Sequence, residues 1–163
     1  VMLFGALDGF EARYRFSMTG HSGETPRELF VPHGEPPAHE KARLRVVERM
    51  VAHSQFCASG DHTLEAAEAA IAAAAKDTDA DERFVFLFSD ANLRRYGIPP
   101  AKLSKVLTSE PSVHAHAIFL SSLGGEAEAL RAEMPSGRAS VCLDAADVPA
   151  AVQRAFAAAV LDA

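Results

Sequence analysis

The sequence predicts an α/β fold, a doubly wound parallel β-sheet with helices on both faces. Segments with the apolar pattern of strands alternate with segments of helical periodicity along the 163 residues, as in strand–helix–strand crossovers. The segment Arg83 to Ser89 (RFVFLFS) is a continuous apolar run, which is typical of a strand covered on both faces. Hydrophobic residues make up 48% of the chain and charged residues 23%, the balance of an ordinary globular domain.

The first part of the chain is expected to contain a helix end and a strand. Val1 to Phe10 has the pattern of the last turns of a helix. Arg13 to Thr19 alternates polar and apolar residues, so Tyr14, Phe16 and Met18 are expected on one face of a half-buried strand. A stretch rich in glycine and proline then predicts turns.

A short strand and two helices are expected next. Leu29 to Val31 is predicted to be an edge strand that ends at Pro32, because proline cannot donate to a ladder. Helices are predicted over Ala38 to Cys57 and over Thr63 to Lys76. The apolar face of the first of these helices is expected to comprise Leu44, Val47, Met50, Val51, Ser54 and Cys57.

The remaining elements continue the alternation of helix and strand. They are predicted over Ala101–Ser109 (helix), Val113–Leu120 (strand), Gly124–Met134 (helix), Arg138–Leu143 (strand) and Asp147–Leu161 (helix). The central strand of a doubly wound sheet usually comes first in the chain, whereas this order begins with a helix. We therefore expect one domain over residues 1–163 whose first strand lies outside the sequence.

Composition and short motifs exclude several classes of function. The net charge of −6 and the absence of a basic run argue against binding to nucleic acid. No apolar run approaches the roughly 18 residues of a membrane span. No GxxxxGKS or GxxxxGKT pattern for a P-loop is present. Cys57 and Cys142 form no CxxC pair, which favours a reducing, intracellular compartment.

Two loops carry candidate ligands for a hard cation. Ser89 and Asp90 follow the apolar strand, at the carboxyl end where open α/β sheets bind ligands. Ser59, Asp61 and Thr63 lie just before a predicted helix. Hydroxyl and carboxylate oxygens suit Mg²⁺ or Ca²⁺. The alternative for each loop is that its acidic residue caps the helix that follows.

A serine hydrolase is an alternative with less support. The segment containing Ser22 (GHSGE) resembles the nucleophile elbow GxSxG, but Glu24 occupies the position of the last glycine. A proline-rich stretch follows it, whereas an elbow leads into a helix. Ser22 or Ser89 would be the nucleophile of such an enzyme.

The histidines offer weaker candidates for a metal site. His114 and His116 are expected on one face of a strand, where packing is the more common role for such a pair. His53, Cys57 and His62 could form a thiolate–imidazole site, although their spacing matches no standard zinc pattern.

The same segments carry a resemblance to a known family. They are GHSGE, HSQFCASGDHTLEA, FVFLFSDANLRRYGI, HAIFLSSLG and MPSGR. They resemble von Willebrand factor A (VWA) domains, and more narrowly the VWA domain at the C-terminus of a large mitochondrial AAA+ ATPase. The resemblance covers nearly all of the chain and implies a Rossmann-like VWA sheet.

The resemblance implies a metal-ion-dependent adhesion site (MIDAS) that holds Mg²⁺. Thr63 matches the threonine of that site and Asp90 matches its last aspartate, while Ser59, Asp61 and Ser89 would lie just outside the ligands. The DxSxS motif, which supplies most ligands in the family, does not occur in this sequence. Mg²⁺ is therefore expected to bind this segment weakly.

The resemblance also implies a function for the segment. It would be a protein-interaction module without catalytic residues, binding a protein partner through the face with the metal. The AAA+ modules of the same parent protein would be further partners, and ATP would bind only there, in mitochondria. The alternatives are the hydrolase and a VWA-like structural domain without metal.

Overall fold

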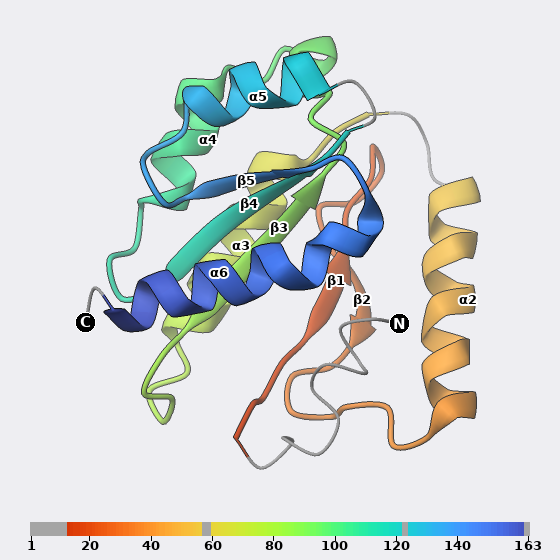
Figure 1. The fold of residues 1–163 in the computed structure, drawn as a ribbon. Helices are drawn as coiled ribbons and strands as arrows, with labels where there is room; N and C mark the ends of the chain where they lie inside the picture. Colours follow the sequence, from red (N-terminus) through yellow and green to blue (C-terminus); the bar gives the residue numbers. More distant parts are fainter. Residues whose placement is uncertain (1–12, 57–59, 122–123, 162–163) are drawn as a thin grey trace. The chain divides into compact units, whose positions relative to one another are not determined.

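The computed structural model describes residues 13–56, 60–121 and 124–161 (Figure 1). The chain forms two compact units, Val1–Ala66 and Ala67–Ala163, called here the N-terminal and the C-terminal unit. The helix end predicted over residues 1–10 lies outside the described residues. Within the described part, none of the helices has both the length and the apolar character needed to cross a membrane.

The N-terminal unit is built on a small antiparallel sheet. Strand β1 (Met18–Gly20) pairs with β2 (Glu28–Val31), and the register shifts between Met18 and Thr19. β1 is shorter than the predicted strand over residues 13–19, because β2 offers only four residues before the chain turns away at Pro32.

The predicted apolar face of this strand is only partly buried. Phe16 and Met18 pack against the buried residues of the unit, whereas Tyr14 is 46% exposed, contrary to the prediction.

Helix α2 (Glu40–Phe56) turns a different face to this sheet from the one predicted. Val46 packs against Phe30 and Val31 of β2. Arg49 donates to the Leu29 carbonyl at 2.7 Å and forms an ion pair with Glu28 at 3.2 Å.

The predicted apolar face of α2 lies largely in solvent. Leu44, Met50 and Val51 are 56%, 41% and 48% exposed. The prediction was wrong because it counted apolar residues alone. Arg49 contacts the sheet through its hydrogen bonds, and His53 lies with its ring edge-on to Phe30, 5.6 Å between centroids.

Helix α3 (Thr63–Ala75) begins in the N-terminal unit and ends in the C-terminal one. Its alanine-rich sequence favours helix at nearly every position. Ala67 and Ile71, one turn apart, are buried. The helix confirms the prediction over residues 63–76 to within one residue.

The C-terminal unit contains a parallel sheet of order β3-β4-β5. β3 (Phe84–Ser89) pairs with β4 (His114–Leu120) from Phe84 opposite His114 to Ser89 opposite Phe119. β5 (Ala139–Cys142) pairs with β4 only from Ala117 onward. Parallel strands joined through helices confirm the predicted α/β class.

Three helices cover the sheet of the C-terminal unit (Figure 1). They are α4 (Pro100–Leu107), α5 (Gly124–Ala132) and α6 (Val148–Leu161). Figure 1 shows α6 across one face and α4 with α5 together on the other side. α4 and α5 each connect two neighbouring parallel strands, and right-handed crossovers place such helices on the same face. Phe156 of α6 packs its ring against Phe84 and Phe86 of β3.

The core of the C-terminal unit centres on β4. Its residues Ala115 to Phe119 are all buried, with Ile118 and Phe119 fully so. β3, predicted to be buried on both faces, is mostly half-buried, and of its residues Leu87 alone is buried. The difference arises because β4 has a strand on each side, whereas β3 is an edge strand among the described residues.

Candidate functional site

The loop before α3 places a buried hydroxyl at the start of the helix. Asp61 caps the helix, because its Oδ1 accepts the Thr63 N–H at 2.6 Å. Thr63 itself is fully buried, and its Oγ1 has no hydrogen-bond partner among the described residues. The predicted capping role of Asp61 is thus confirmed, and the hydroxyl of Thr63 remains available to a ligand.

The loop between β1 and β2 lies against this helix start, which the sequence did not predict. The Nδ1 of His62 donates to the Ser22 carbonyl at 2.6 Å. Gly60 has φ +147°, and a Cβ there would come within 2.7 Å of the Gly23 Cα. Only glycine permits such a close approach of two backbones. The glycines of the GHSG and SGDH strings were the one signal for it.

Burial lowers the pKa of His21 in the same loop below its usual value. Desolvation is the main cause, and the charges of His62 and His53 act in the same direction, while Asp61 opposes them. The imidazole is therefore neutral at neutral pH.

In the C-terminal unit, the loop after β3 presents an exposed carboxylate. Asp90 is exposed, and its Oδ1 accepts the Asn92 N–H at 3.0 Å. The Ser89 Oγ accepts the Ala91 N–H at 3.2 Å. Ala91 has φ +65°, a conformation that costs a residue with a Cβ about 1–2 kcal/mol and clusters at functional sites.

The candidate ligands are thus distributed over two loops. Asp61 and Thr63 are neighbours in the N-terminal unit, and Ser89 and Asp90 are neighbours in the C-terminal unit. Ser59, and Cys57 of the alternative thiolate–imidazole site, lie outside the described residues. Each loop is ordered by its own hydrogen bonds. The first loop leads into the start of a helix, and the second follows the end of a strand.

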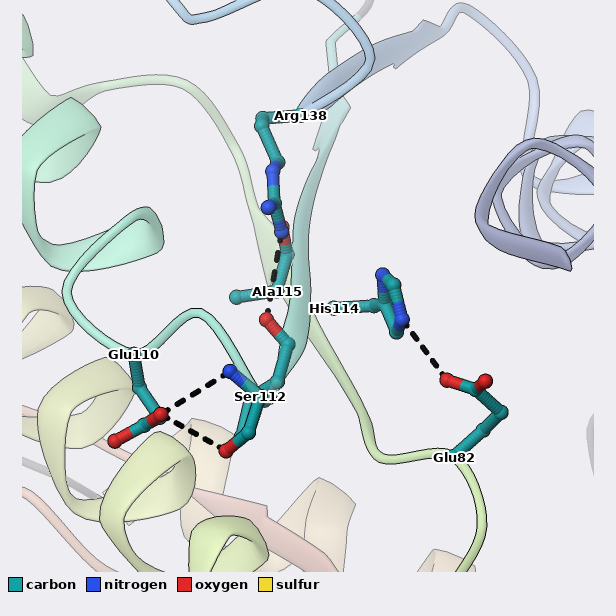
Figure 2. A network of polar contacts seen from close by, with 7 residues as sticks. Glu82, Glu110, Ser112, His114, Ala115 and Arg138 are labelled. Atoms are coloured by element: carbon teal, nitrogen blue, oxygen red, sulfur yellow. Dashed lines mark hydrogen bonds and ion pairs between the residues drawn. The ribbon is translucent and has the colours of Figure 1, made fainter. Parts of the chain in front are cut away.

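The strand histidines have protein partners. His114 Nε2 lies 2.9 Å from Glu82 Oε2 (Figure 2). His116 is buried, with its Nδ1 2.9 Å from the Gly137 carbonyl and its Nε2 2.9 Å from the Ser140 hydroxyl. A carbonyl can only accept, so Nδ1 carries the proton and Nε2 accepts from Ser140. Packing is therefore the role that these contacts give His116.

Other polar contacts complete the start of β4. Arg138 donates to the carbonyls of Val113 and Ala115, at 3.4 and 3.3 Å, where β5 does not yet pair (Figure 2). The Glu110 carboxylate accepts the N–H and the hydroxyl of Ser112, which lowers the pKa of Glu110. In the described ranges, no three His, Cys, Asp or Glu side chains converge as metal ligands.

Ser22 does not have the geometry of a nucleophile elbow. It lies in the loop between β1 and β2, not between a strand and a helix, and it is buried. Its Oγ accepts the Glu24 N–H at 3.3 Å, and His62 contacts its carbonyl. Ser89 is likewise engaged by the Ala91 N–H. The hydrolase alternative therefore finds no support at either serine.

Comparison with known proteins identifies a relative. The chain is 42% identical over 160 residues to the von Willebrand factor A domain-containing protein 8 of Mus musculus. The match covers 98% of this chain and 8% of the mouse protein, so the chain spans about a twelfth of the relative's length. No protein-family model matches the chain. No solved structure matches it.

Proposed function

Given this VWA-like relationship, we propose that the segment is a metal-ion-dependent protein-interaction module. A Mg²⁺ ion bound at the loop ends would bind a carboxylate of a protein partner. The observation that carries the proposal is the hydroxyl of Thr63, fully buried and without a hydrogen-bond partner among the described residues.

An unpartnered buried hydroxyl is costly. Leaving such a group unsatisfied destabilises a protein by about 1–3 kcal/mol, so nearly all are paired. The chemistry of the site suits a hard cation, since a hydroxyl and a carboxylate are oxygen ligands. In the VWA pattern that the sequence resembles, the hydroxyl corresponds to Thr63 and the charge to Asp90.

The surrounding residues keep each ligand in place. Asp61 ties the backbone at Thr63 to the helix start. The Asn92 N–H donates to one oxygen of Asp90, and Ala91 between them has the left-handed conformation. When bound, the cation would attract an anionic group of the partner.

Two protein ligands leave most of the Mg²⁺ octahedron open. In the proposal, water, the partner and the DxSxS motif of the wider family fill the remaining positions. Mg²⁺ binding to residues 1–163 alone is accordingly weak.

The setting of the module is part of the same proposal. ATP hydrolysis would take place in AAA+ modules of a larger, mitochondrial protein, and these modules would be partners of the segment. The segment itself would perform no chemistry. The hydroxyls of Ser22 and Ser89 each accept a backbone N–H.

The second candidate is a VWA-like structural domain without metal. No group of three or more His, Cys, Asp or Glu residues in the described ranges could hold an ion by itself. In that case the buried Thr63 hydroxyl would remain from a metal site that the domain has lost.

Mg²⁺ titration followed by amide NMR separates the two candidates. The proposal expects Mg²⁺-dependent shifts at Leu64 and Asn92 that disappear in Asp90→Ala. The matched control is Asp144→Ala, since Asp144 makes the same kind of turn, accepting the Ala146 N–H at 2.8 Å, at the start of another helix. Undiminished Mg²⁺ binding in Asp90→Ala, or no shifts at any Mg²⁺ concentration, would contradict the metal site.

A further inference from the structure

The short helix η1 (Leu93–Tyr96) begins three residues after Asp90 and presents a basic, aromatic surface. Arg94, Arg95 and Tyr96 are all exposed, with 76% of the Arg94 side chain in solvent. The surface formed by these three residues is called the η1 surface below. It is basic, although the net charge of the chain is −6.

The η1 surface is held rigidly. Leu93 and Ile98, on either side of it, are 1% and 8% exposed and anchor the turn in the core. Gly97 ends the turn in the left-handed conformation, and its N–H donates to the Arg94 carbonyl at 3.1 Å. The Ile98 N–H donates to the Leu93 carbonyl at 3.1 Å. A backbone that is already ordered loses little conformational entropy on binding.

The two arginines differ in their partners. Arg94 forms an ion pair with Glu133 at 3.2 Å, so part of its charge is compensated. Arg95 has no carboxylate partner among the described residues, and its guanidinium lies over the Tyr96 ring, 5.9 Å from the centroid. A guanidinium stacked on an aromatic ring keeps its edge free for a planar anion.

The η1 surface and the candidate ligand belong to one ordered segment. The Asn92 N–H bonds to Asp90, and the Arg95 N–H donates to the Asn92 carbonyl at 3.2 Å. If one carboxylate of the partner lies near Asp90, a second carboxylate a few residues away in the partner could therefore reach Arg95.

We propose that the η1 surface binds an acidic segment of a protein partner, with Arg95 pairing with a carboxylate next to the one at the cation. The inference rests on the proposed function and names the class of partner for it. A carboxylate is favoured over a nucleic-acid phosphate, because the acidic chain has no further basic run to follow a phosphate backbone.

The test uses residues 1–163 and defined probes in a fluorescence anisotropy titration at low salt. The probes are a labelled peptide of glycine, aspartate and glutamate, the same peptide with asparagine and glutamine, and a phosphoserine peptide. Arg95→Gln is compared with Arg154→Gln, which removes the same charge from the exposed side of α6. Each is measured with Mg²⁺ and with EDTA.

The acidic peptide is expected to bind the unaltered chain, and Arg95→Gln to weaken binding about fivefold, as for an exposed charge pair. Arg154→Gln should leave it unchanged. A loss of peptide binding in Arg95→Gln that persists in EDTA supports the η1 surface. If Asp90→Ala has no effect on binding in the same experiment, that result contradicts the metal site alone.

Three outcomes would overturn the inference. The first is equal binding of the acidic and the amide peptides, and the second is unchanged binding in Arg95→Gln. The third is failure of the acidic peptide to bind, whether or not the phosphoserine peptide does.

Discussion

Two buried polar side chains, one in each unit, have opposite surroundings. His116 is 7% exposed, and both ring nitrogens have partners, the Gly137 carbonyl and the Ser140 hydroxyl. Thr63 is 0% exposed, and its hydroxyl has none among the described residues. Burial is nearly the same at both positions, so burial alone does not distinguish a structural polar group from a group that could bind a ligand.

The difference lies in what each group gains from the protein. The hydrogen bonds of a satisfied polar group offset the free-energy cost of its desolvation and fix the packing around it. An unsatisfied one only costs free energy in the unliganded protein. We therefore interpret His116 as part of the fold and Thr63 as part of a site, and three measurements test this contrast.

The largest expected effect is on His116. Replacing it with Phe keeps a ring in the core but leaves the Gly137 carbonyl and the Ser140 hydroxyl without their partner. The free energy of unfolding, measured by urea denaturation, should fall by about 3 kcal/mol.

His114→Phe is the matched control on the same strand. Its hydrogen bond with Glu82 is partly exposed, with 31% and 43% of the two side chains in solvent, so the loss should be less than about 1 kcal/mol. Equal losses in the two variants would contradict the assignment of His116 as the structural histidine.

A smaller effect is expected from pH. Burial is the main cause that lowers the pKa of His116, and the charge of Arg138 adds to it, while the hydrogen bond to Gly137 opposes them. The folded value lies below the ordinary 6.5, so the contribution of His116 to stability is complete above pH 6.5. It is lost as pH falls through the lowered value, by at most about 1.4 kcal/mol per pH unit.

Urea denaturation at a series of pH values checks this slope. Below pH 6.5, stability should fall less steeply in His116→Asn than in the unaltered chain. His21→Asn should also flatten the slope, because burial lowers the pKa of His21 in the same direction. A slope unchanged in His116→Asn would show that its imidazole does not resist protonation.

The smallest effect is expected at Thr63. Valine has nearly the same shape, and the substitution removes a hydroxyl that makes no hydrogen bond in the described structure. The free energy of unfolding without Mg²⁺ should stay the same or rise by about 1 kcal/mol. A loss of more than about 1 kcal/mol would mean that the hydroxyl is already satisfied in the unliganded protein.

Much of the fold could be predicted because local patterns were strong. Alanine-rich and amphipathic segments predicted α2, α3 and α6, and the apolar run before Asp90 predicted β3. The contact face of α2 could not be predicted, because Arg49 contacts the sheet through hydrogen bonds and His53 through an edge-on ring contact, which hydrophobicity does not record. The burial of β3 depends on its neighbours in the sheet, which its own sequence does not specify.

The candidate site was predictable only in part. Strand ends and helix starts predicted the positions of Asp90 and Asp61, and the structure confirms the capping bond of Asp61. The isolation of the Thr63 hydroxyl is a property of its surroundings and has no sequence signal. The metal, its remaining ligands and the partner stay predictions.

The close approach of Gly60 to Gly23 has a mechanical consequence. The two backbones are in contact, with no side chain between them to absorb a displacement. The His62 hydrogen bond to Ser22 ties the same two loops together. A ligand of Thr63 that displaced the helix start would therefore also displace the β1–β2 loop in contact with it.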